Sequence, residues 1–110
     1  PAYSVYLIQK DGRDIGYLTM HKADEIVLQS LYILSEYQRQ GIGRAAFDFI
    51  KAYCREHGAK SFTCHCVPEN FNARSFYERM GGEVIGEDLT NEARWQNSVT
   101  YQFTLPSKVT

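Results

Sequence analysis

The stretch that decides the fold reads Gln38-Arg39-Gln40-Gly41-Ile42-Gly43-Arg44, between an apolar run at residues 31–34 and an amphipathic stretch at residues 45–56. Glycine allows a tight turn between a strand and a helix in which successive backbone N–H groups face outward. The dipole of the following helix adds positive potential at the same place. The stretch predicts a pyrophosphate site, but a single G-x-G pair is too common in turns to prove one.

Length and charge limit what the protein can be. Its 110 residues suit one domain, and we expect residues 1–110 to form it. A formal net charge of -1 and a pI near 6.4 exclude a broad basic face, so we expect no nucleic-acid partner. No apolar stretch approaches the roughly 18 residues of a membrane span, and the first residues read as a strand, not as a signal peptide. We expect a cytoplasmic protein without a membrane partner.

The three cysteines, Cys54, Cys64 and Cys66, are an odd number and do not form a disulfide framework. Free thiols in a reducing compartment fit this pattern. The sequence Cys64-His65-Cys66 also suggests a zinc site, because thiolates and imidazole are zinc ligands. On a strand, however, the two thiols point to one face and the imidazole to the other, and no second ligand pair follows. We therefore expect buried thiols and no metal.

Strand patterns occupy the first third of the chain. Residues 3–10 and 14–20 alternate in polarity around Asp11-Gly12, which is a hairpin signal. A third strand is expected at residues 26–34. Its alternation is disturbed by the polar pair Gln29-Ser30, which predicts a bulge or a local splay of the sheet.

Two later segments have helical spacing. The first begins near residue 43, ends at residues 57–58, and places on one face Ile42, Ala46, Phe49, Ile50 and Tyr53. The second covers residues 72–80 and ends at Gly81-Gly82. Strands are expected at residues 61–67, 83–87 and 98–105, with a polar connection at 88–97 that carries Trp95. The order predicts an α/β (α+β) fold with a mixed, largely antiparallel sheet, a central β-loop-α-β-α unit, and an anion site at the carboxyl end of a central strand.

Two motifs in this order resemble those of the GNAT superfamily of N-acetyltransferases. They are Gln38-x-x-Gly41-x-Gly43 and Asn70-x-x-Ala73-x-x-Phe76-Tyr77-x-x-x-Gly81. The resemblance runs from about residue 3 to residue 105. A Rossmann fold is less suitable because the third glycine of its fingerprint is missing and antiparallel strands precede the motif. Gly82 stands where the family often has phenylalanine, so we expect a packing change there.

The resemblance implies acetyl-CoA as co-substrate. In the family, the end of the third strand pairs its backbone with the pantetheine arm, the glycine loop cradles the pyrophosphate, and the asparagine of the second motif contacts the cofactor. The matching residues are Leu31, Ile33, Gln38, Arg39, Gln40, Gly41, Ile42, Gly43, Arg44 and Asn70.

Tyr77 matches the family's tyrosine that protonates the departing CoA thiolate. A thiolate with a pKa near 8.5 needs such a proton donor. The alternative is a purely core role, which the helical spacing of Tyr77 with Ala73 and Met80 also allows. The sequence places all three cysteines away from the reacting groups, so we expect direct attack in a ternary complex without a covalent enzyme intermediate.

A base must also deprotonate the amine, because an alkylammonium has no lone pair. The middle of the third strand offers Val27, Gln29 and Leu31, none of which can do this. His65, five residues before Asn70, resembles a position where some family members carry a glutamate, and a neutral imidazole there could accept the proton. The alternative is a hydrogen-bonded strand histidine without catalytic duty.

The strand and helices that usually open the GNAT fold have no counterpart before residue 3. We expect either a piece of a longer protein or a minimal version completed by a partner or by a homodimer, because an uncovered strand edge favours association. Three functions remain open. They are an N-acetyltransferase acting on a small-molecule or peptide amine, an inactive acyl-CoA-binding module, and a plain interaction domain.

Overall fold

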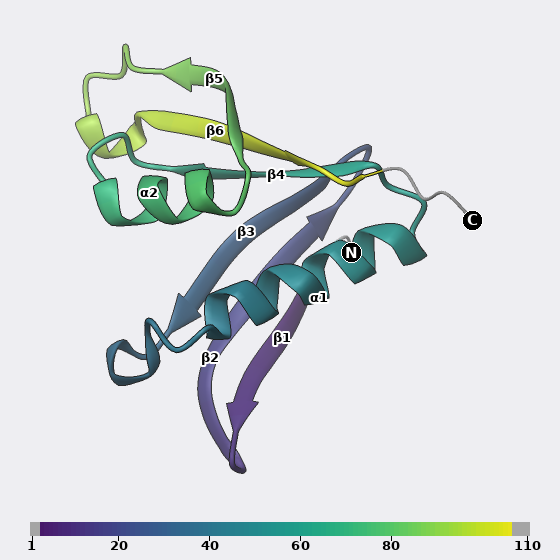
Figure 1. Cartoon of the computed structure of the whole chain (residues 1–110). Helices are drawn as coiled ribbons and strands as arrows, with labels where there is room; N and C mark the ends of the chain where they lie inside the picture. The colour runs from purple at the N-terminus through teal and green to yellow at the C-terminus, as the bar shows by residue number, and fades with distance from the viewer. Residues whose placement is uncertain (1–2, 107–110) are drawn as a thin grey trace.

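The structure, a computed structural model, describes residues 3–106 and contains one six-stranded mixed sheet in the order β1-β2-β3-β4-β6-β5 (Figure 1). Only β3 and β4 run parallel to each other. The strands are β1 (Tyr3–Lys10), β2 (Arg13–Lys22), β3 (Ile26–Ile33), β4 (Ser61–Cys66), β5 (Glu83–Asp88) and β6 (Ser98–Thr104). The helices are α1 (Ile42–Glu56), α2 (Phe71–Arg79) and the short 3₁₀ turns η1 (Ser35–Tyr37) and η2 (Arg94–Gln96). The predicted α+β class and the β-loop-α-β-α unit are confirmed.

The first two strands form the predicted hairpin. Asp11 and Gly12 connect them with φ angles of 52° and 79°, so both turn residues adopt the left-handed conformation that a two-residue hairpin loop prefers. Asparagine, aspartate and glycine tolerate this conformation best, which explains why the pair Asp11-Gly12 marks the turn.

The sheet opens where the sequence predicted a bulge. In the β2–β3 ladder Thr19 pairs with Ser30 and Met20 with Leu28, which leaves Gln29 without a partner. On its other side β3 pairs with β4 only from Ile26 to Leu28. Beyond Leu28 the two parallel strands diverge, and the divergence is visible in Figure 1. The bulge bends β3 away from β4, and the prediction of a bulge or splay is confirmed.

Helix α1 packs on one face of the sheet, and two of the predicted residues, Ala46 and Ile50, are buried there. Phe49 is 42% exposed, whereas Phe47 is 1% exposed and lies in the core. The buried face comprises Ala46, Phe47, Ile50 and Cys54. The prediction for Phe49 was wrong because Phe47 finds aromatic partners on α2 and β6, while Phe49 packs edge-on against Tyr6 at the sheet margin.

Helix α2 covers the same face as α1. The ring of Phe47 lies 5.3 Å from that of Phe76 and 5.0 Å from that of Phe103, between centroids. A Cβ on Gly82 would come within 2.7 Å of the Phe103 ring, so the packing of this ring favours glycine at position 82.

The opposite face of strands β1 to β3 is uncovered. Val5 is 67% exposed and Leu7 62%, whereas their neighbours Tyr6 and Ile8 pack against the core. Leu7 pairs with Tyr17, and Tyr17 with Tyr32, so exposed apolar residues cross three strands. Both α-helices within residues 3–106 lie on the other face. Neither of them has the length and apolar character needed to cross a membrane.

Candidate active site

The candidate site begins with unpaired backbone groups on β3. The Leu34 N–H donates to the Ile15 carbonyl on the β2 side at 2.8 Å. Because backbone groups alternate in direction along a strand, those of Leu31 and Ile33 point to the other side, into the opening toward β4. The Ile33 carbonyl accepts a hydrogen bond from Nε2 of Gln38 at 2.9 Å. The N–H and carbonyl of Leu31 and the N–H of Ile33 therefore face the opening between β3 and β4.

The glycine loop leads from this strand end into α1. Arg39 and Gly41 have φ angles of 63° and 81°, so two left-handed residues shape the turn. The first bond of the helix runs from the Ala45 N–H to the Gly41 carbonyl at 3.0 Å. The N–H groups of Ile42, Gly43 and Arg44 therefore have no acceptor within the helix, and its first turn contains no acidic residue. Such a terminus favours an anion.

The two sequence motifs meet at Gly43. A Cβ at this position would lie 2.9 Å from the ring of Phe76, which is closer than side chains tolerate. Glycine is therefore required so that the start of α1 can approach α2. This contact places the open N–H groups of the loop next to the helix that carries Tyr77.

Tyr77 is packed among aromatic rings and faces a thiol. Its ring lies 5.5 Å from that of Tyr101 and 6.3 Å from that of Phe47. Its hydroxyl neighbours the thiol of Cys64. Desolvation, and then the neighbouring thiols, raise the pKa of Tyr77 above its usual value, so the phenol keeps its proton at neutral pH. The structure thus combines a packed ring with a protonated hydroxyl.

Cys64 lies beside the reacting position that we predicted for Tyr77. The side chain of Tyr77 reaches back to β4, which brings its hydroxyl to this thiol. Burial raises the pKa of the Cys64 thiol to about 12, so it is not a thiolate at neutral pH. Cys54 and Cys64 are buried, as predicted, and Cys66 is half-buried.

Asn70 is the N-cap of α2. Its Oδ1 accepts a hydrogen bond from the Ala73 N–H at 3.2 Å. The sequence prediction assigned Asn70 only to the co-substrate and missed this structural role. The signal was present, since asparagine three residues before the first periodic apolar position is a common helix start.

His65 lies on the exposed face of β4, with its neighbours Cys64 and Cys66 turned to the helix side, as the strand alternation predicted. Its Nδ1 is 2.8 Å from the Thr100 hydroxyl on β6. Since Tyr77 contacts Cys64, Tyr77 and His65 lie on opposite faces of the same strand. The part of the chain that the structure describes contains no cluster of three or more His, Cys, Asp or Glu side chains that could hold a metal.

The connection between β5 and β6 lies at the carboxyl end of β4, because Val99 pairs with Cys66. It is braced by Asn91, whose backbone N–H and side-chain amide both donate to Oδ1 of Asn97 at 3.1 Å. Arg94 approaches Glu69 to 3.7 Å. Trp95 is 74% exposed, so it does not cover the sheet.

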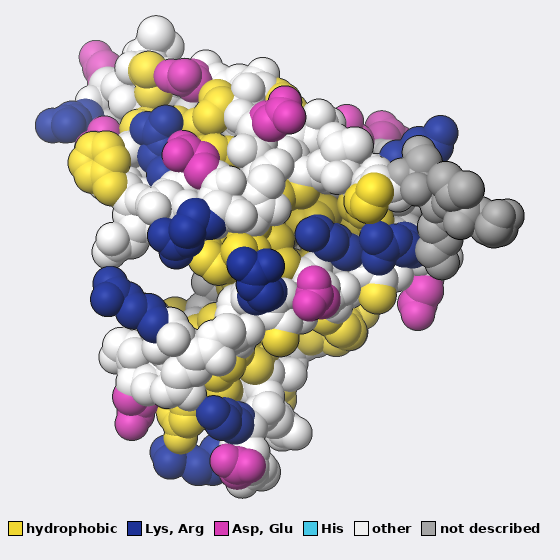
Figure 2. Space-filling model, in the orientation of Figure 1, with side chains coloured by type: hydrophobic (Ala, Val, Ile, Leu, Met, Phe, Trp, Pro, Cys, Tyr) yellow, Lys and Arg dark blue, Asp and Glu magenta, His cyan; other side chains and the backbone are white. Residues whose placement is uncertain are grey.

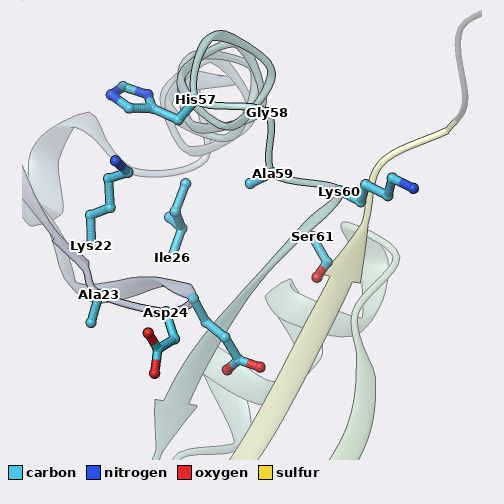
Figure 3. A pocket seen from close by; sticks show the side chains of 10 residues that line it. Lys22, Ala23, Asp24, Ile26, His57, Gly58, Ala59, Lys60 and Ser61 are labelled. Carbon is cyan, nitrogen blue, oxygen red and sulfur yellow. The ribbon is translucent and has the colours of Figure 1, made fainter.

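A hollow marks the candidate site on the molecular surface. Figure 2 shows it between the part with β4, β5, β6 and α2 and the part with β1 to β3 and α1, with Lys and Arg side chains on both sides. A separate cavity of about 230 Å³ lies at the opposite end of the parallel strands, between residues 22–26 and 57–61 (Figure 3). Open sheets bind ligands at the carboxyl ends of their strands, so the hollow is the better candidate.

Residues 1–82 match the model of the "Acetyltransferase (GNAT) family". The chain belongs to the GNAT acetyltransferase family. A relative from Pseudomonas phage PaMx11, the "5-NmdU N-acetyltransferase", is 28% identical over 91 residues, which are 80% of this chain and 63% of that relative. The chain therefore spans less than two thirds of the length of that relative.

Solved GNAT structures share the fold. A GNAT family acetyltransferase from Elizabethkingia anophelis with acetyl-CoA bound matches with a TM-score of 0.80 and 13% identity, over 94% of this chain and 77% of that one. A Bacillus anthracis str. Ames protein described as a streptothricin acetyltransferase, in complex with acetyl coenzyme A, matches with a TM-score of 0.87 and 17% identity. The second match covers 96% of this chain and 64% of that one.

Proposed function

We propose that the protein transfers an acetyl group from acetyl-CoA to a primary amine by direct attack in a ternary complex. One observation carries the proposal: the sheet opens beyond Leu28, between the free N–H groups of α1 and the hydroxyl of Tyr77. An extended thioester fits this opening because the backbone edge of β3 there has no strand partner among residues 3–106.

The proposed donor site uses mostly backbone groups. Leu31 and Ile33 would bond the pantetheine arm as an added strand does, and the N–H groups from Arg39 to Arg44 would hold the pyrophosphate. The side chain of Gln38 fixes the loop to the end of β3 by its bond to the Ile33 carbonyl. Asn70 contributes by capping α2 and, as a further proposal, by contacting acetyl-CoA.

The proposed chemistry needs two proton movements. The amine nitrogen attacks the thioester carbonyl, the C–N bond forms, the C–S bond breaks, and the electron pair remains on sulfur. Tyr77 donates its proton to that sulfur and regains one from solvent. The raised pKa of Tyr77 suits protonation after C–S cleavage has begun, because the phenol releases its proton only as negative charge develops on the sulfur.

The second proton leaves the amine toward His65, directly or through a water molecule. Two observations support this role: His65 is exposed on the face opposite Tyr77, and its Nδ1 is held by Thr100, which orients the ring. The amine would then approach the thioester from the His65 face of β4, and the Tyr77 hydroxyl would approach it from the other face.

The acceptor class is tested by measuring thiol release from acetyl-CoA with a panel of amines. The panel contains polyamines, peptide amino termini, lysine peptides, aminoglycosides and 5-NmdU, which the phage relative is named for. We expect at least one amine to release CoA thiol at a rate above that of solvent hydrolysis. Tight acetyl-CoA binding without release for every amine would contradict the proposal.

A second candidate is an inactive acyl-CoA-binding module that another polypeptide completes. The uncovered apolar face of β1 to β3 favours it, together with a groove of about 360 Å³ between β1 and α1. Under this alternative a homodimer or a partner covers the free edge of β1. Equilibrium sedimentation of the free chain tests the homodimer, and a clean monomer at micromolar concentration would remove it.

A further inference from the structure

A buried hydroxyl in the centre of β6 connects the sheet to α2. Tyr101 is 0% exposed, and its Oη accepts a hydrogen bond from Nε of Arg74 at 3.0 Å. The same Oη donates to Oε2 of Glu78 at 2.8 Å. Arg74 also donates to the Pro68 carbonyl, in the turn before the helix, at 3.2 Å. The phenol thus joins β6 to two positions of α2, and Arg74 extends the network to the β4–α2 turn.

These bonds surround Tyr77. Arg74 and Glu78 are one turn apart on α2, so the two bonds to Tyr101 lie on either side of Tyr77 along the helix. The Tyr101 ring is 5.5 Å from the Tyr77 ring. Tyr101 also pairs with Cys64 on β4, the residue whose thiol the Tyr77 hydroxyl faces. The network therefore joins the helix that carries Tyr77 to the strand that pairs with Cys64.

Helix α2 depends on such bonds more than α1 does. It has nine residues and no buried one, whereas α1 has fifteen residues and four buried ones. A helix of this length is marginal by itself, and the apolar side chains that pack it on the core, Phe76, Tyr77 and Met80, are only partly buried. A buried phenol without partners would in turn be costly, so the bonds of Tyr101 strongly favour one rotation of α2 over others.

We propose that Tyr101, Arg74 and Glu78 form a positioning network that holds the Tyr77 hydroxyl at the opening of the sheet for proton transfer to the leaving thiolate. The inference rests on the proposed function, in which Tyr77 is the proton donor. Tyr101 itself touches neither substrate. Its effect on the rate passes through Tyr77, because proton transfer requires the two heavy atoms to lie within hydrogen-bond reach.

The test is a double-mutant cycle on the rate of thiol release. It uses acetyl-CoA and the amine of the panel above that gives the highest rate. Tyr101→Phe removes one oxygen and keeps the ring. We expect kcat to fall about 10-fold with KM for acetyl-CoA within about twofold, since a small misplacement of a reacting group costs this much. In a Tyr77→Phe background the same change should lower kcat less than about twofold.

Two further variants separate positioning from general stability. Tyr53→Phe removes the same atom from α1, where the ring stacks on His57 away from the opening, and should leave kcat unchanged. Glu78→Gln keeps an acceptor for Tyr101 and should retain most of the rate, whereas Glu78→Ala should lower it as Tyr101→Phe does. Thermal unfolding of each variant shows whether the folded state persists under assay conditions.

The outcomes distinguish the inference from the function on which it rests. A wild-type chain without thiol release, or an unaffected Tyr77→Phe variant, overturns the proposed function and the network's role with it. An active enzyme that needs Tyr77, but in which Tyr101→Phe lowers kcat equally in both backgrounds, overturns the network alone. Equal rates for Glu78→Gln and Glu78→Ala would also contradict the positioning role.

Discussion

The two halves of the sheet provide different kinds of chemistry. The half with β1 to β3 and α1 presents backbone groups to the opening, at Leu31 and in the glycine loop. The half with β4 to β6 and α2 presents side chains, among them Tyr77 and His65. Within the sheet, the halves are joined by three residue pairs of β3 and β4, from Ile26 to Leu28. The first half therefore suits recognition of the donor and the second suits proton transfer.

This difference predicts how each half responds to mutation. A backbone site tolerates exchange of its side chains but not a change of its turn geometry. A side-chain site loses its function when a single atom is removed. The following four predictions test this contrast, from the largest expected effect to the smallest.

Removal of the Tyr77 hydroxyl should have the largest effect. We expect Tyr77→Phe to lower kcat about 100-fold, in the range for loss of an acid catalyst, with little change in KM for acetyl-CoA. The measurement is initial-rate thiol release, with Tyr53→Phe as the matched control on α1. A rate within twofold of wild type would mean that Tyr77 is only a core residue and that the second half has a different acid.

His65→Gln should lower kcat/KM at neutral pH about 10-fold and remove the acidic limb of the pH profile. The reason is that protonation of an imidazole base abolishes its lone pair, and glutamine does not titrate. His57→Gln is the control, because His57 stacks on Tyr53 at the end of α1. An acidic limb that persists in His65→Gln would assign the base elsewhere.

The buried thiols of Cys64 and Cys54 predict a loss of stability at high pH. Burial raises the pKa of Cys64 from 9.0 to about 12 and that of Cys54 to about 11, so the folded state binds these protons more tightly than the unfolded chain. The stabilisation is complete below pH 9 and is lost as the pH rises toward 11 to 12.

Urea unfolding at pH 8, 9 and 10 measures this effect. The free energy of unfolding should fall by about 1 kcal/mol per thiol at pH 10, and Cys64→Ala should make the decline shallower. Cys66→Ala, which removes a half-buried thiol from the same strand, should change the slope less. Identical slopes in wild type and Cys64→Ala would show that water reaches the space beside Tyr77.

The glycine loop should respond to geometry and not to side-chain identity. Gly41 and Gly12 both have positive φ angles, 81° and 79°, with open space around the missing Cβ. Either alanine variant should therefore cost about 1 kcal/mol of stability. Only Gly41→Ala should also weaken acetyl-CoA binding, about threefold or more, because it reshapes the loop.

Arg39→Ala completes this comparison, since it removes a side chain and keeps the loop backbone. Calorimetric titration should find its affinity for acetyl-CoA within about twofold of wild type, as expected for loss of one exposed charge. A larger loss of acetyl-CoA affinity for Arg39→Ala than for Gly41→Ala would contradict the comparison, because the loop would then bind mainly through a side chain.

Local sequence patterns predicted most of the elements correctly. The hairpin at Asp11-Gly12, the disturbed strand at Gln29 and the two glycine-ended helices all follow from turn chemistry and periodicity. Periodicity placed Ala46 and Ile50 correctly on the buried face of α1, but it chose Phe49 where the structure buries Phe47. The predicted face and the observed face of α1 differ by a rotation about the helix axis. Aromatic partners on α2 and β6 favour the rotation that buries Phe47. A single segment contains no information about those partners.

The sequence by itself determined the family, the order of the elements and the residues that match the donor loop and Tyr77, because these depend on short-range motifs. Tertiary structure alone decided three features: the width of the opening between β3 and β4, the place of Cys64 beside Tyr77, and the Tyr101 bonds to α2. Each of these joins residues far apart in the chain, on different strands or helices. Such contacts arise from the packing of whole elements, and no local pattern of residues records them.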